Sequence, residues 1–452
     1  MRKNMEHAGQ AQNNPAQKML KYRWVIFFLL CTAYILVRFH RQSMAVISID
    51  LVQDFQLDPL SLGVLSSMNF YPYSFMQIPA GLMADSIGPR RLTSVAFALA
   101  GLGTVMFACA LTFPVAVGAR FIIGLGLACI YVPTLKILSV WFRTNEFATL
   151  TGILNSVGSL GGLIAAAPLA LIVAATGWRN ALLVIGVVTV VIAAVIYLIV
   201  RNNPREVGLP TIAEIDGFAP AQGGRAERMP TGQAMKLAFT NKYAWILYVR
   251  GFIANASGAA LQSLWGVPFL ISVYGMTRLQ ASSTIMMMAI GSLITSPIGG
   301  YLSDRVLRSR KKLFVFSAVV NYCFWIPLAF FTDKLSPQFL AIQFLCMGLT
   351  MGLGMGSAFA MAKELFPPTM TGTVNGVNNF FGMLGGAVFQ VILGYIIRLY
   401  SPVADVYTAQ GFHMAYLFVF TTLTGSVLLT LFTKETYKGS EAVPAKAKAE
   451  TV

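Results

Sequence analysis

The sequence predicts an all-α membrane protein in which twelve transmembrane helices form two pseudo-symmetric six-helix bundles. Three observations predict this fold class. The chain is 56% hydrophobic and only 11% charged, with a mean hydropathy of +0.68, whereas soluble domains carry roughly 25% charged residues. Twelve apolar segments reach the length of about 20 residues that a helix needs to cross a bilayer. Two different motifs also recur in the same order in the two halves, which indicates a duplicated half.

The apolar segments divide into two sets of six. The first set lies at 24–50, 61–84, 92–113, 116–140, 147–174 and 178–200, and the second at 244–274, 280–303, 313–333, 336–362, 369–399 and 411–433. The expected organisation is a tail at 1–22, a bundle at 23–200, a linker at 201–243, a bundle at 244–433 and a tail at 434–452. The linker is polar and proline-rich, and the C-terminal tail is small and charged, so we expect that tail to be disordered.

The first repeated motif closes the second and eighth segments. It comprises Gly81, Asp85, Gly88, Arg90 and Arg91 in the first half, and Gly300, Asp304 and Arg305 in the second. Because each half holds six spans, both halves begin on the same side of the membrane and are parallel repeats.

The second repeated motif is a row of glycines in the fifth and eleventh segments. It comprises Gly152, Asn155, Gly158, Gly161 and Gly162, and returns as Gly376, Asn379, Gly382, Gly385 and Gly386. Glycines at this spacing let helix backbones approach closely, which favours helix packing in lipid. The two asparagines could hydrogen-bond across the interface between the halves or contact a substrate, and both roles remain open.

Basic residues define the expected topology. The net charge is +16, but lysines and arginines gather in alternate loops, a pattern typical of membrane orientation rather than of nucleic-acid binding. The other set of loops holds only Arg179, Arg278, Lys334 and Arg398. The sequence therefore predicts that both termini lie in the cytosol, and the polar N-terminus does not resemble a signal peptide.

The loop motif between the second and third segments resembles the signature of the major facilitator superfamily. Its weaker echo lies between the eighth and ninth segments, where that family repeats it, and the resemblance covers about residues 20–435. The resemblance implies two bundles that rock around a central site. It also implies that Asp85 and Asp304 act in cytosolic gates, where each accepts hydrogen bonds from a helix N-terminus or an arginine.

Five cations interrupt the apolar segments, at a cost of about 2.5–3.5 kcal/mol each at mid-helix. Arg38 and Arg41 are three residues apart and so share one helix face, with His40 between them. We expect these three to bind substrate, with snorkelling of the arginines toward the membrane surface as the alternative. The weaker candidates are Arg120, Lys136 and Arg250.

Acidic residues indicate the charge of the substrate. None of the 17 lies deep in an apolar segment, so the central cavity should be electropositive and favour an anion or a zwitterion. The text around Arg41 resembles hexuronate and galactonate symporters, organophosphate–phosphate antiporters and lysosomal dipeptide carriers. His40 stands where the symporters carry an aspartate, so proton coupling, exchange and uniport all remain open.

Polar and aromatic residues complete the candidate substrate site, with hydrogen bonding between helices as the alternative role. They are Tyr71, Tyr73, Asn255, Gln262 and Trp265.

Enzyme function is not expected. The three histidines are scattered, no nucleophile is grouped with a base, and no Walker loop is present. The five cysteines lie in apolar segments without a C-x-x-C pair, which disfavours disulfides and metal sites. The sequence thus predicts no catalytic residues, no metal and no cofactor.

Together these observations predict a secondary transporter that moves a small organic solute by alternating access. The alternatives are a dipeptide or amino-acid uniporter, a multi-substrate exporter and a transporter-like sensor. The expected partners are a small-molecule substrate, a proton or counter-solute if transport is coupled, and the lipid bilayer. We expect a monomer in a bacterial inner membrane, with the direction of transport open.

Overall fold

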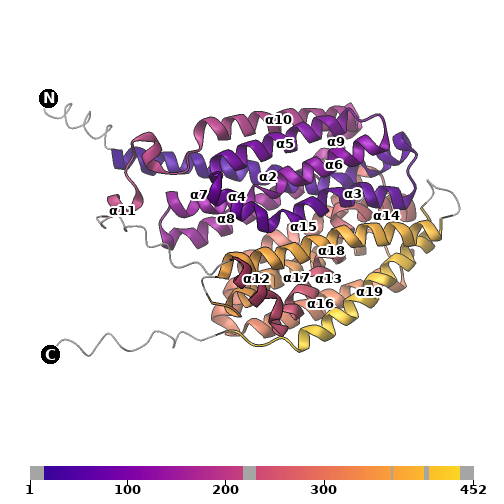
Figure 1. The fold of residues 1–452 in the computed structure, drawn as a ribbon. Coiled ribbons are helices and arrows are strands. Elements are labelled where there is room, and N and C mark those ends of the chain that lie inside the picture. Colours follow the sequence, from indigo (N-terminus) through magenta and orange to yellow (C-terminus); the bar gives the residue numbers. More distant parts are fainter. Residues whose placement is uncertain (1–14, 217–230, 368–369, 402–406, 438–452) are drawn as a thin grey trace, which may run out of the picture.

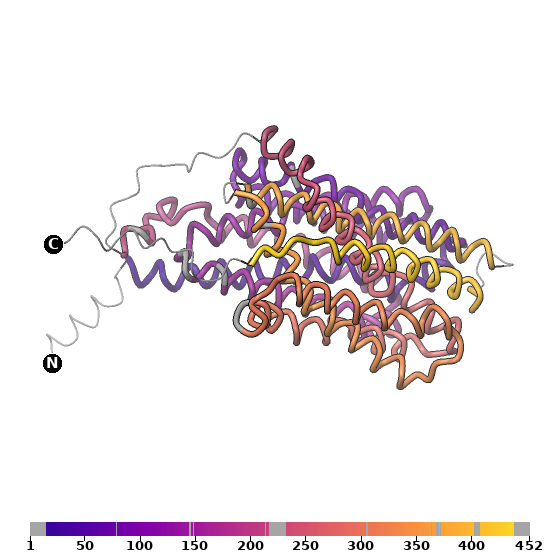
Figure 2. The backbone as a smooth tube through the Cα atoms, turned by 90° about the horizontal axis from the view of Figure 1, so that it is seen from below, coloured from indigo at the N-terminus to yellow at the C-terminus, as the bar shows by residue number. Residues whose placement is uncertain are grey.

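The computed structural model describes residues 15–216, 231–367, 370–401 and 407–437. All regular elements of these residues are helical. Figure 1 shows two groups of long helices, an upper one from the first half of the chain and a lower one from the second. In Figure 2 the helices of both groups run along a common direction. We call the side where α2 begins and α19 ends the terminal side, and the opposite side the far side.

The first group contains nine helices: α2 (Pro15–Phe55), α3 (Pro59–Phe75), α4 (Gln77–Ser86), α5 (Pro89–Ala108), α6 (Phe113–Ala128), α7 (Tyr131–Trp141), α8 (Thr144–Ile164), α9 (Ala167–Thr176) and α10 (Trp178–Ile199). The described part of the linker holds three short elements: η1 (Pro204–Val207), α11 (Ile212–Ile215) and α12 (Thr231–Thr240). The linker therefore has local helical structure that its polar composition did not predict.

The second group runs from α13 to α19. Its elements are α13 (Lys242–Ala259), the π-helical turn η2 (Ala260–Trp265), α14 (Gly266–Tyr274), α15 (Arg278–Tyr301), the π-helical turn η3 (Leu302–Val306), α16 (Arg310–Phe330), α17 (Pro337–Glu364), α18 (Thr371–Leu399) and α19 (Ala409–Leu431).

Eleven helices of the described chain are long and apolar enough to cross a membrane. The predicted span at 61–84 is interrupted at Met76, which divides it into α3 and α4, and it is not among these eleven. The first helix begins at Pro15, inside the predicted tail. The disorder expected of the C-terminal tail falls mostly on residues 438–452, outside the described residues.

Prolines explain the interruptions within the apolar segments. A proline lacks the N–H that would bond to the carbonyl four residues earlier, and its ring clashes with that carbonyl. The break between α6 and α7 lies at Cys129 and Ile130, one turn before Pro133, and the break between α8 and α9 lies just before Pro168. The break at Met76 lies three residues before Pro79, whose ring would clash with the carbonyl of Phe75, the last residue of α3.

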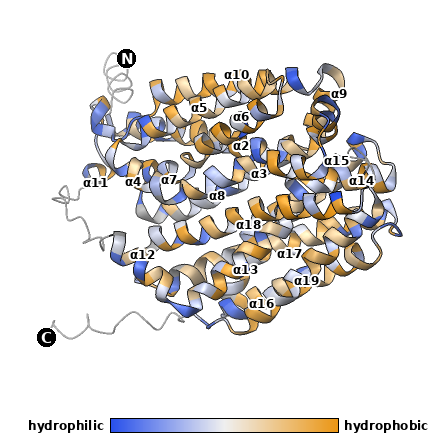
Figure 3. Cartoon of the chain, turned by 45° about the vertical axis from the view of Figure 1, so that its right-hand side comes forward, coloured by the Kyte–Doolittle hydropathy of each residue, from blue (hydrophilic) through white to orange (hydrophobic). Residues whose placement is uncertain are grey.

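The outer surface of the bundle is apolar. On α10, Val184, Val191 and Leu198 are 61%, 54% and 66% exposed. Figure 3 shows hydrophobic residues along the helices and hydrophilic residues gathered at helix ends and connections. Such a surface would be an aggregation liability in water but matches hydrocarbon. The chain is therefore a multi-pass membrane protein.

The two glycine rows hold equivalent helix pairs together. A Cβ at Gly161 of α8 would lie 2.0 Å from the Ile35 carbonyl oxygen of α2, and a Cβ at Gly385 of α18 would lie 2.1 Å from the Phe252 carbonyl oxygen of α13. Both glycines thus permit backbone contact that any side chain would prevent. Gly152 differs, because a Cβ there would meet no atom within 4 Å.

Candidate functional site

The side chain of Arg41 reaches from the first half of the molecule to the second. Its Nη2 donates to Met383 Sδ of α18 at 2.9 Å. Its Cζ lies 5.5 Å from the ring centre of Phe70 and 5.2 Å from that of Tyr73, both on α3. Aromatic faces stabilise a cation without neutralising it. Arg41 therefore keeps its positive charge at the interface between the two halves.

Arg38 lies one turn closer to the terminal side. Its Cζ is 5.5 Å from the ring centre of Tyr34, and its Nε is buried without a hydrogen-bond partner. Arg38 lines a small open cavity between the halves, together with residues from α2, α8, η2 and α15: Gln42, Ser159, Gly162, Gln262, Ala289 and Ser292. In this conformation the cavity volume is only about 60 Å³, which is well below the size range of small-molecule sites.

Neither arginine is neutralised by the protein. Among the described residues, ion pairs involve other cations, and no carboxylate pairs with Arg38 or Arg41. Arg38 lines the cavity, whereas Arg41 lies beside it, against Phe70, Tyr73 and Met383. Two cations without a carboxylate partner this close together create a positive potential that attracts anions. The arrangement suits an anionic group that accepts hydrogen bonds from a guanidinium.

His40 and Arg120 face the interior of the first bundle rather than this cavity. His40 is 1% exposed, and its Nε2 lies 3.2 Å from Thr189 Oγ1 of α10. Arg120 is 2% exposed and lies over the ring of Phe107 at 5.7 Å. His40 follows Arg38 by two positions, so its side chain points to a different side of α2. The structure does not bring these two residues to the surroundings of Arg38 and Arg41.

Lys136 of α7 contacts the first loop motif. Its Nζ lies 2.7 Å from Asp85 Oδ1 and donates to the carbonyl of Ala84 at 2.7 Å. From the same motif, Arg90 donates to the Tyr197 carbonyl at the end of α10. The motif thus ties α4 and α5 to α7 and α10 within the first bundle. In the second copy, the side chains of Asp304 and Arg305 lie outside the described residues.

The remaining candidate site residues lie in different environments and do not form one cluster. Arg250 lies over the ring of Phe314 at 4.3 Å, inside the second bundle. Trp265 is fully buried and donates to the Gln390 carbonyl of α18 at 3.3 Å. Tyr71 is half-buried on α3, and Asn255 is exposed beside Gly382. Of the polar candidates, only Gln262 lines the cavity with Arg38.

The two asparagines of the glycine rows make different contacts. Asn379 donates to Gln77 Oε1 of α4 at 2.6 Å and so joins the two halves. Asn155 donates to Tyr131 Oη at 3.0 Å and stays within the first bundle. The motif is repeated, but its asparagine links the halves in one copy only.

Sequence reasoning missed Gln42 and Met383. Gln42 follows Arg38 by four positions, so the helical repeat places both on one face of α2 and could have identified it. Met383 carries no such signal, because an apolar residue beside a glycine is ordinary in a membrane helix.

Polar contacts close the far side between the halves. Arg278 Nη2 of α15 lies 2.6 Å from Asp50 Oδ1 of α2, and Arg398 Nε of α18 lies 3.1 Å from Asp58 Oδ2. A Cβ at Gly63 would lie 2.4 Å from the Gln390 carbonyl oxygen, so α3 and α18 are in backbone contact. These contacts hold the two halves together on the far side.

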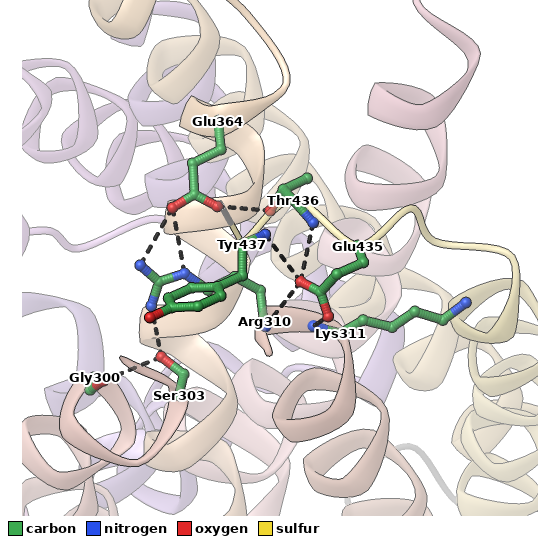
Figure 4. A network of polar contacts seen from close by, with 8 residues as sticks. All are labelled: Gly300, Ser303, Arg310, Lys311, Glu364, Glu435, Thr436 and Tyr437. Atoms are coloured by element: carbon green, nitrogen blue, oxygen red, sulfur yellow. Dashed lines mark hydrogen bonds and ion pairs between the residues drawn. The ribbon is translucent and has the colours of Figure 1, made fainter. Parts of the chain in front are cut away.

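A polar network binds the segment that follows the last helix to the terminal side of the second bundle (Figure 4). Glu435 accepts from Ser309 and from the backbone N–H of Arg310 at the start of α16. Thr436 donates to Glu364 at 2.6 Å, and Arg310 donates to Glu364 at 3.2 Å. The carboxylate of Glu435 thus satisfies donors at a helix N-terminus, where negative charge is favourable.

We expect Glu435→Gln to lower the thermal stability of the protein at pH 7. Partial burial raises the pKa of Glu435, but hydrogen bonds from Ser309 and from the backbone N–H groups of Tyr437, Arg310 and Lys311 outweigh it and hold the pKa below its ordinary 4.5. A depressed pKa contributes stability that is present above pH 4.5 and is lost as the pH falls through the folded value. The stability difference between the variant and the native protein, measured by thermal unfolding, should therefore shrink below pH 4.5. A difference that stays constant down to pH 3 would contradict this role.

Comparisons with known proteins agree with this architecture. The family model described as Major Facilitator Superfamily matches residues 26–390. A probable hexose phosphate transport protein of Chlamydia trachomatis is 23% identical over 84% of this chain and 87% of its own length. A probable sulfoacetate transporter of Cupriavidus necator is 24% identical, covering 84% and 89%. A glycerol-3-phosphate transporter of Bacillus subtilis is 23% identical, covering 88% and 91%.

Solved structures share the fold. A bacterial homologue of the human lysosomal transporter Spinster, in an inward-facing and unoccupied conformation, superposes with a TM-score of 0.70 at 17% identity, covering 91% of this chain and 95% of its own. A D-xylose–proton symporter gives a TM-score of 0.72 at 14% identity, covering 92% and 99%. The relatives and the fold are those of transporters and not of enzymes. The chain belongs to the Major Facilitator Superfamily.

Proposed function

We propose that this protein is a secondary transporter that carries a small organic anion by alternating access. The observation that carries the proposal is the pair Arg38 and Arg41, which lies between the two halves without a carboxylate partner among the described residues. Hexose phosphate, sulfoacetate and glycerol-3-phosphate, named for the relatives, are all anions. An anion held by Arg38, Arg41 and the cavity hydroxyls of Ser159 and Ser292 would contact both halves at once.

The same charge pattern favours exchange of one anion for another. With no carboxylate to compensate the two arginines, an empty site that closes on both sides buries uncompensated positive charge, which costs several kcal/mol per ion. A bound anion removes that cost. Reorientation should therefore be fast when the site is loaded and slow when it is empty, which is the kinetic signature of an antiporter.

We further propose that α3 and α4 together form a single interrupted span, which brings the total to twelve. Both termini then lie on the terminal side, which we assign to the cytosol of a bacterial cell. In this orientation the described conformation is closed to the outside. The protein works as a monomer, since each chain carries a complete interface between its two halves.

Proteoliposome flux tests the proposal. Purified protein in vesicles loaded with a sugar phosphate or a sulfonate should take up the labelled anion at least about tenfold faster than vesicles loaded with buffer alone. Uptake that does not depend on the internal anion but increases with a pH gradient would indicate proton coupling instead of exchange. If the vesicles take up a dipeptide but no simple anion, the substrate is a zwitterion and not an anion.

The far-side ion pairs give a conformational prediction. We expect Asp50→Asn combined with Asp58→Asn to loosen the far side, because each removes an ion pair between the halves. Partly exposed pairs contribute about 0–1 kcal/mol each, so hydrogen exchange at the far-side ends of α2 and α15 should rise up to about tenfold. Asp54→Asn is the matched control, since Asp54 pairs with Arg179 within the first bundle. Equal acceleration in the control would contradict a closure between halves.

A further inference from the structure

Two glutamines form a hydrogen bond across the centre of the molecule. Gln42 Nε2 of α2 donates to Gln262 Oε1 of the π-helical turn η2 at 3.2 Å. Both side chains are half-buried. Together with the contacts of Arg41 to Met383 and of Asn379 to Gln77, this bond is one of the polar contacts that join the halves near their middle.

The glutamine pair lies at the boundary between two cavities. One is the charged cavity of Arg38, Ser159 and Ser292 described above. The other is a small, mostly apolar chamber of about 10 Å³, roughly the volume that one water molecule needs. Its lining includes Ala45, Val46, Ala166, Val267 and Ile285. Both cavities are lined by the glutamines and by two small residues: Gln42, Gly162, Gln262 and Ala289.

The apolar chamber lies on the far side of the pair on each helix that lines both cavities. Along α2 the lining passes from Arg38 through Gln42 to Val46, and α2 runs toward the far side. Along α15, which runs the opposite way, it passes from Ser292 through Ala289 to Ile285. The same order holds from Ser159 through Gly162 of α8 to Ala166, and from Gln262 of η2 to Val267 of α14. The amide pair therefore separates the charged cavity from a chamber that leads toward the far side.

The backbone is adapted to this pair. A Cβ at Gly162 of α8 would lie 2.2 Å from Gln42 Oε1, so only glycine leaves room for the Gln42 side chain in this position. Gln262 is carried by the π-helical turn between α13 and α14. Such turns insert an extra residue into a helix and are frequent at functional sites.

We propose that Gln42 and Gln262 form an inner gate that closes the charged cavity toward the far side. The inference rests on the proposed transport function, because only alternating access requires the gate to open. A single hydrogen bond between neutral amides suits this task, since its net contribution is about 0.5–1.5 kcal/mol. Because only one weak hydrogen bond closes the gate, it can open during each transport cycle. Opening the gate joins the two cavities into one path.

Thiol labelling tests the gate without reference to transport. Ala166→Cys places a thiol in the chamber beyond the gate, and Ser159→Cys places one in the charged cavity before it. In the Gln262→Met background, which keeps the side-chain size and removes the hydrogen bond, labelling of Ala166→Cys by a water-soluble maleimide should rise about two- to tenfold. Labelling of Ser159→Cys should not change. Mass spectrometry of the labelled peptide distinguishes the introduced thiol from the native cysteines.

Gly162→Ala is a second variant that keeps the inference testable if Gln262→Met folds poorly. The added methyl displaces the Gln42 side chain, so it should raise the labelling of Ala166→Cys by a similar factor. Unchanged labelling of Ala166→Cys in both folded variants would overturn the gate. Equal increases at Ser159→Cys and Ala166→Cys would also overturn it, because they would indicate general loosening of the helices.

Cross-linking then connects the gate to transport. In the variant Gln42→Cys/Gln262→Cys, a short cleavable dithiol reagent should stop anion exchange, and reductant should restore it. Anion-induced thermal stabilisation should persist, because the charged cavity lies before the gate. Exchange that continues in the cross-linked protein, or a pair that cannot be cross-linked, would overturn the gate. Failure of the proposed function gives a different result. In that case the native protein does not exchange anions, whereas the labelling of Ala166→Cys still rises in the gate variants.

Discussion

Arg41→Ala is expected to abolish the thermal stabilisation that anions confer on the purified protein. The native guanidinium lies between Phe70, Tyr73 and Met383, without a carboxylate that could substitute for a bound anion. Truncating one partner of a buried charged hydrogen bond costs about 2–5 kcal/mol, so affinity should fall at least about 30-fold. A thermal-shift screen of sugar phosphates, sugar acids, sulfonates and dipeptides measures the loss.

Two further variants separate charge from geometry in the screen. Arg41→Lys keeps the charge but loses the planar donor fork and the stacking on aromatic rings, so it should recover only part of the affinity. Lys334→Ala removes an exposed cation on the far side and should bind like the native protein. Native affinity in Arg41→Ala would contradict a substrate contact, and strong stabilisation by a cationic compound would contradict an anion site.

Gly161→Ala is expected to have the largest effect on stability. The added methyl would lie 2.0 Å from the Ile35 carbonyl oxygen and 2.9 Å from Arg38 Cβ, so α2 and α8 must move apart. A backbone atom cannot move away as a side chain can, and overpacking of this kind typically costs about 1–3 kcal/mol, occasionally more. The variant should unfold at a clearly lower temperature in detergent, and its arginine site should be distorted because Arg38 lies in the same contact.

Matched controls exist in both halves. Gly152→Ala lies on the same helix, where a Cβ would meet nothing within 4 Å, and it should match or exceed the native stability because alanine favours helix over glycine. In the second half, Gly385→Ala should destabilise and Gly372→Ala should not, for the same reasons. Equal losses in all four variants would mean that helix propensity, rather than close approach of backbones, governs these positions.

The apolar segments and the duplicated motifs were sufficient to predict the helical membrane fold. The thickness of the bilayer sets the length of each apolar segment. Such a segment can be recognised from consecutive residues alone. The interruption at Met76 was not predicted, because a proline in an apolar segment is compatible with a kink as well as with a break. The helical residues 15–22 at the start of α2 were missed because Gln17, Lys18 and Lys21 interrupt the apolar pattern. Hydropathy alone cannot distinguish a helical extension from a tail.

The candidate site was only partly predictable. Charge in an apolar segment identified Arg38 and Arg41, because an uncompensated cation in a membrane requires a reason. The same argument also selected Lys136, which instead pairs with Asp85 of a different segment. Hydropathy indicates that a charge in the membrane is costly. It gives no information about which carboxylate, distant in the sequence, lies close to that charge in space. His40 was selected by proximity in sequence, and helical phase places it on a different face.

The length of α2 has a mechanical consequence. Its 41 residues correspond to about 60 Å at a rise of 1.5 Å per residue, roughly twice the hydrocarbon thickness of a bilayer. The helix has no break, unlike α3 and α4 or α6 and α7, and it carries the two arginines, the Gln42 amide and, near the terminal side, Arg23 in an ion pair with Glu146. It therefore acts as a stiff lever, in which a tilt of about 5° displaces one end by about 5 Å relative to the other. A tilt of only a few degrees at the arginines would in this way appear as a displacement of about 5 Å between the two ends of the helix.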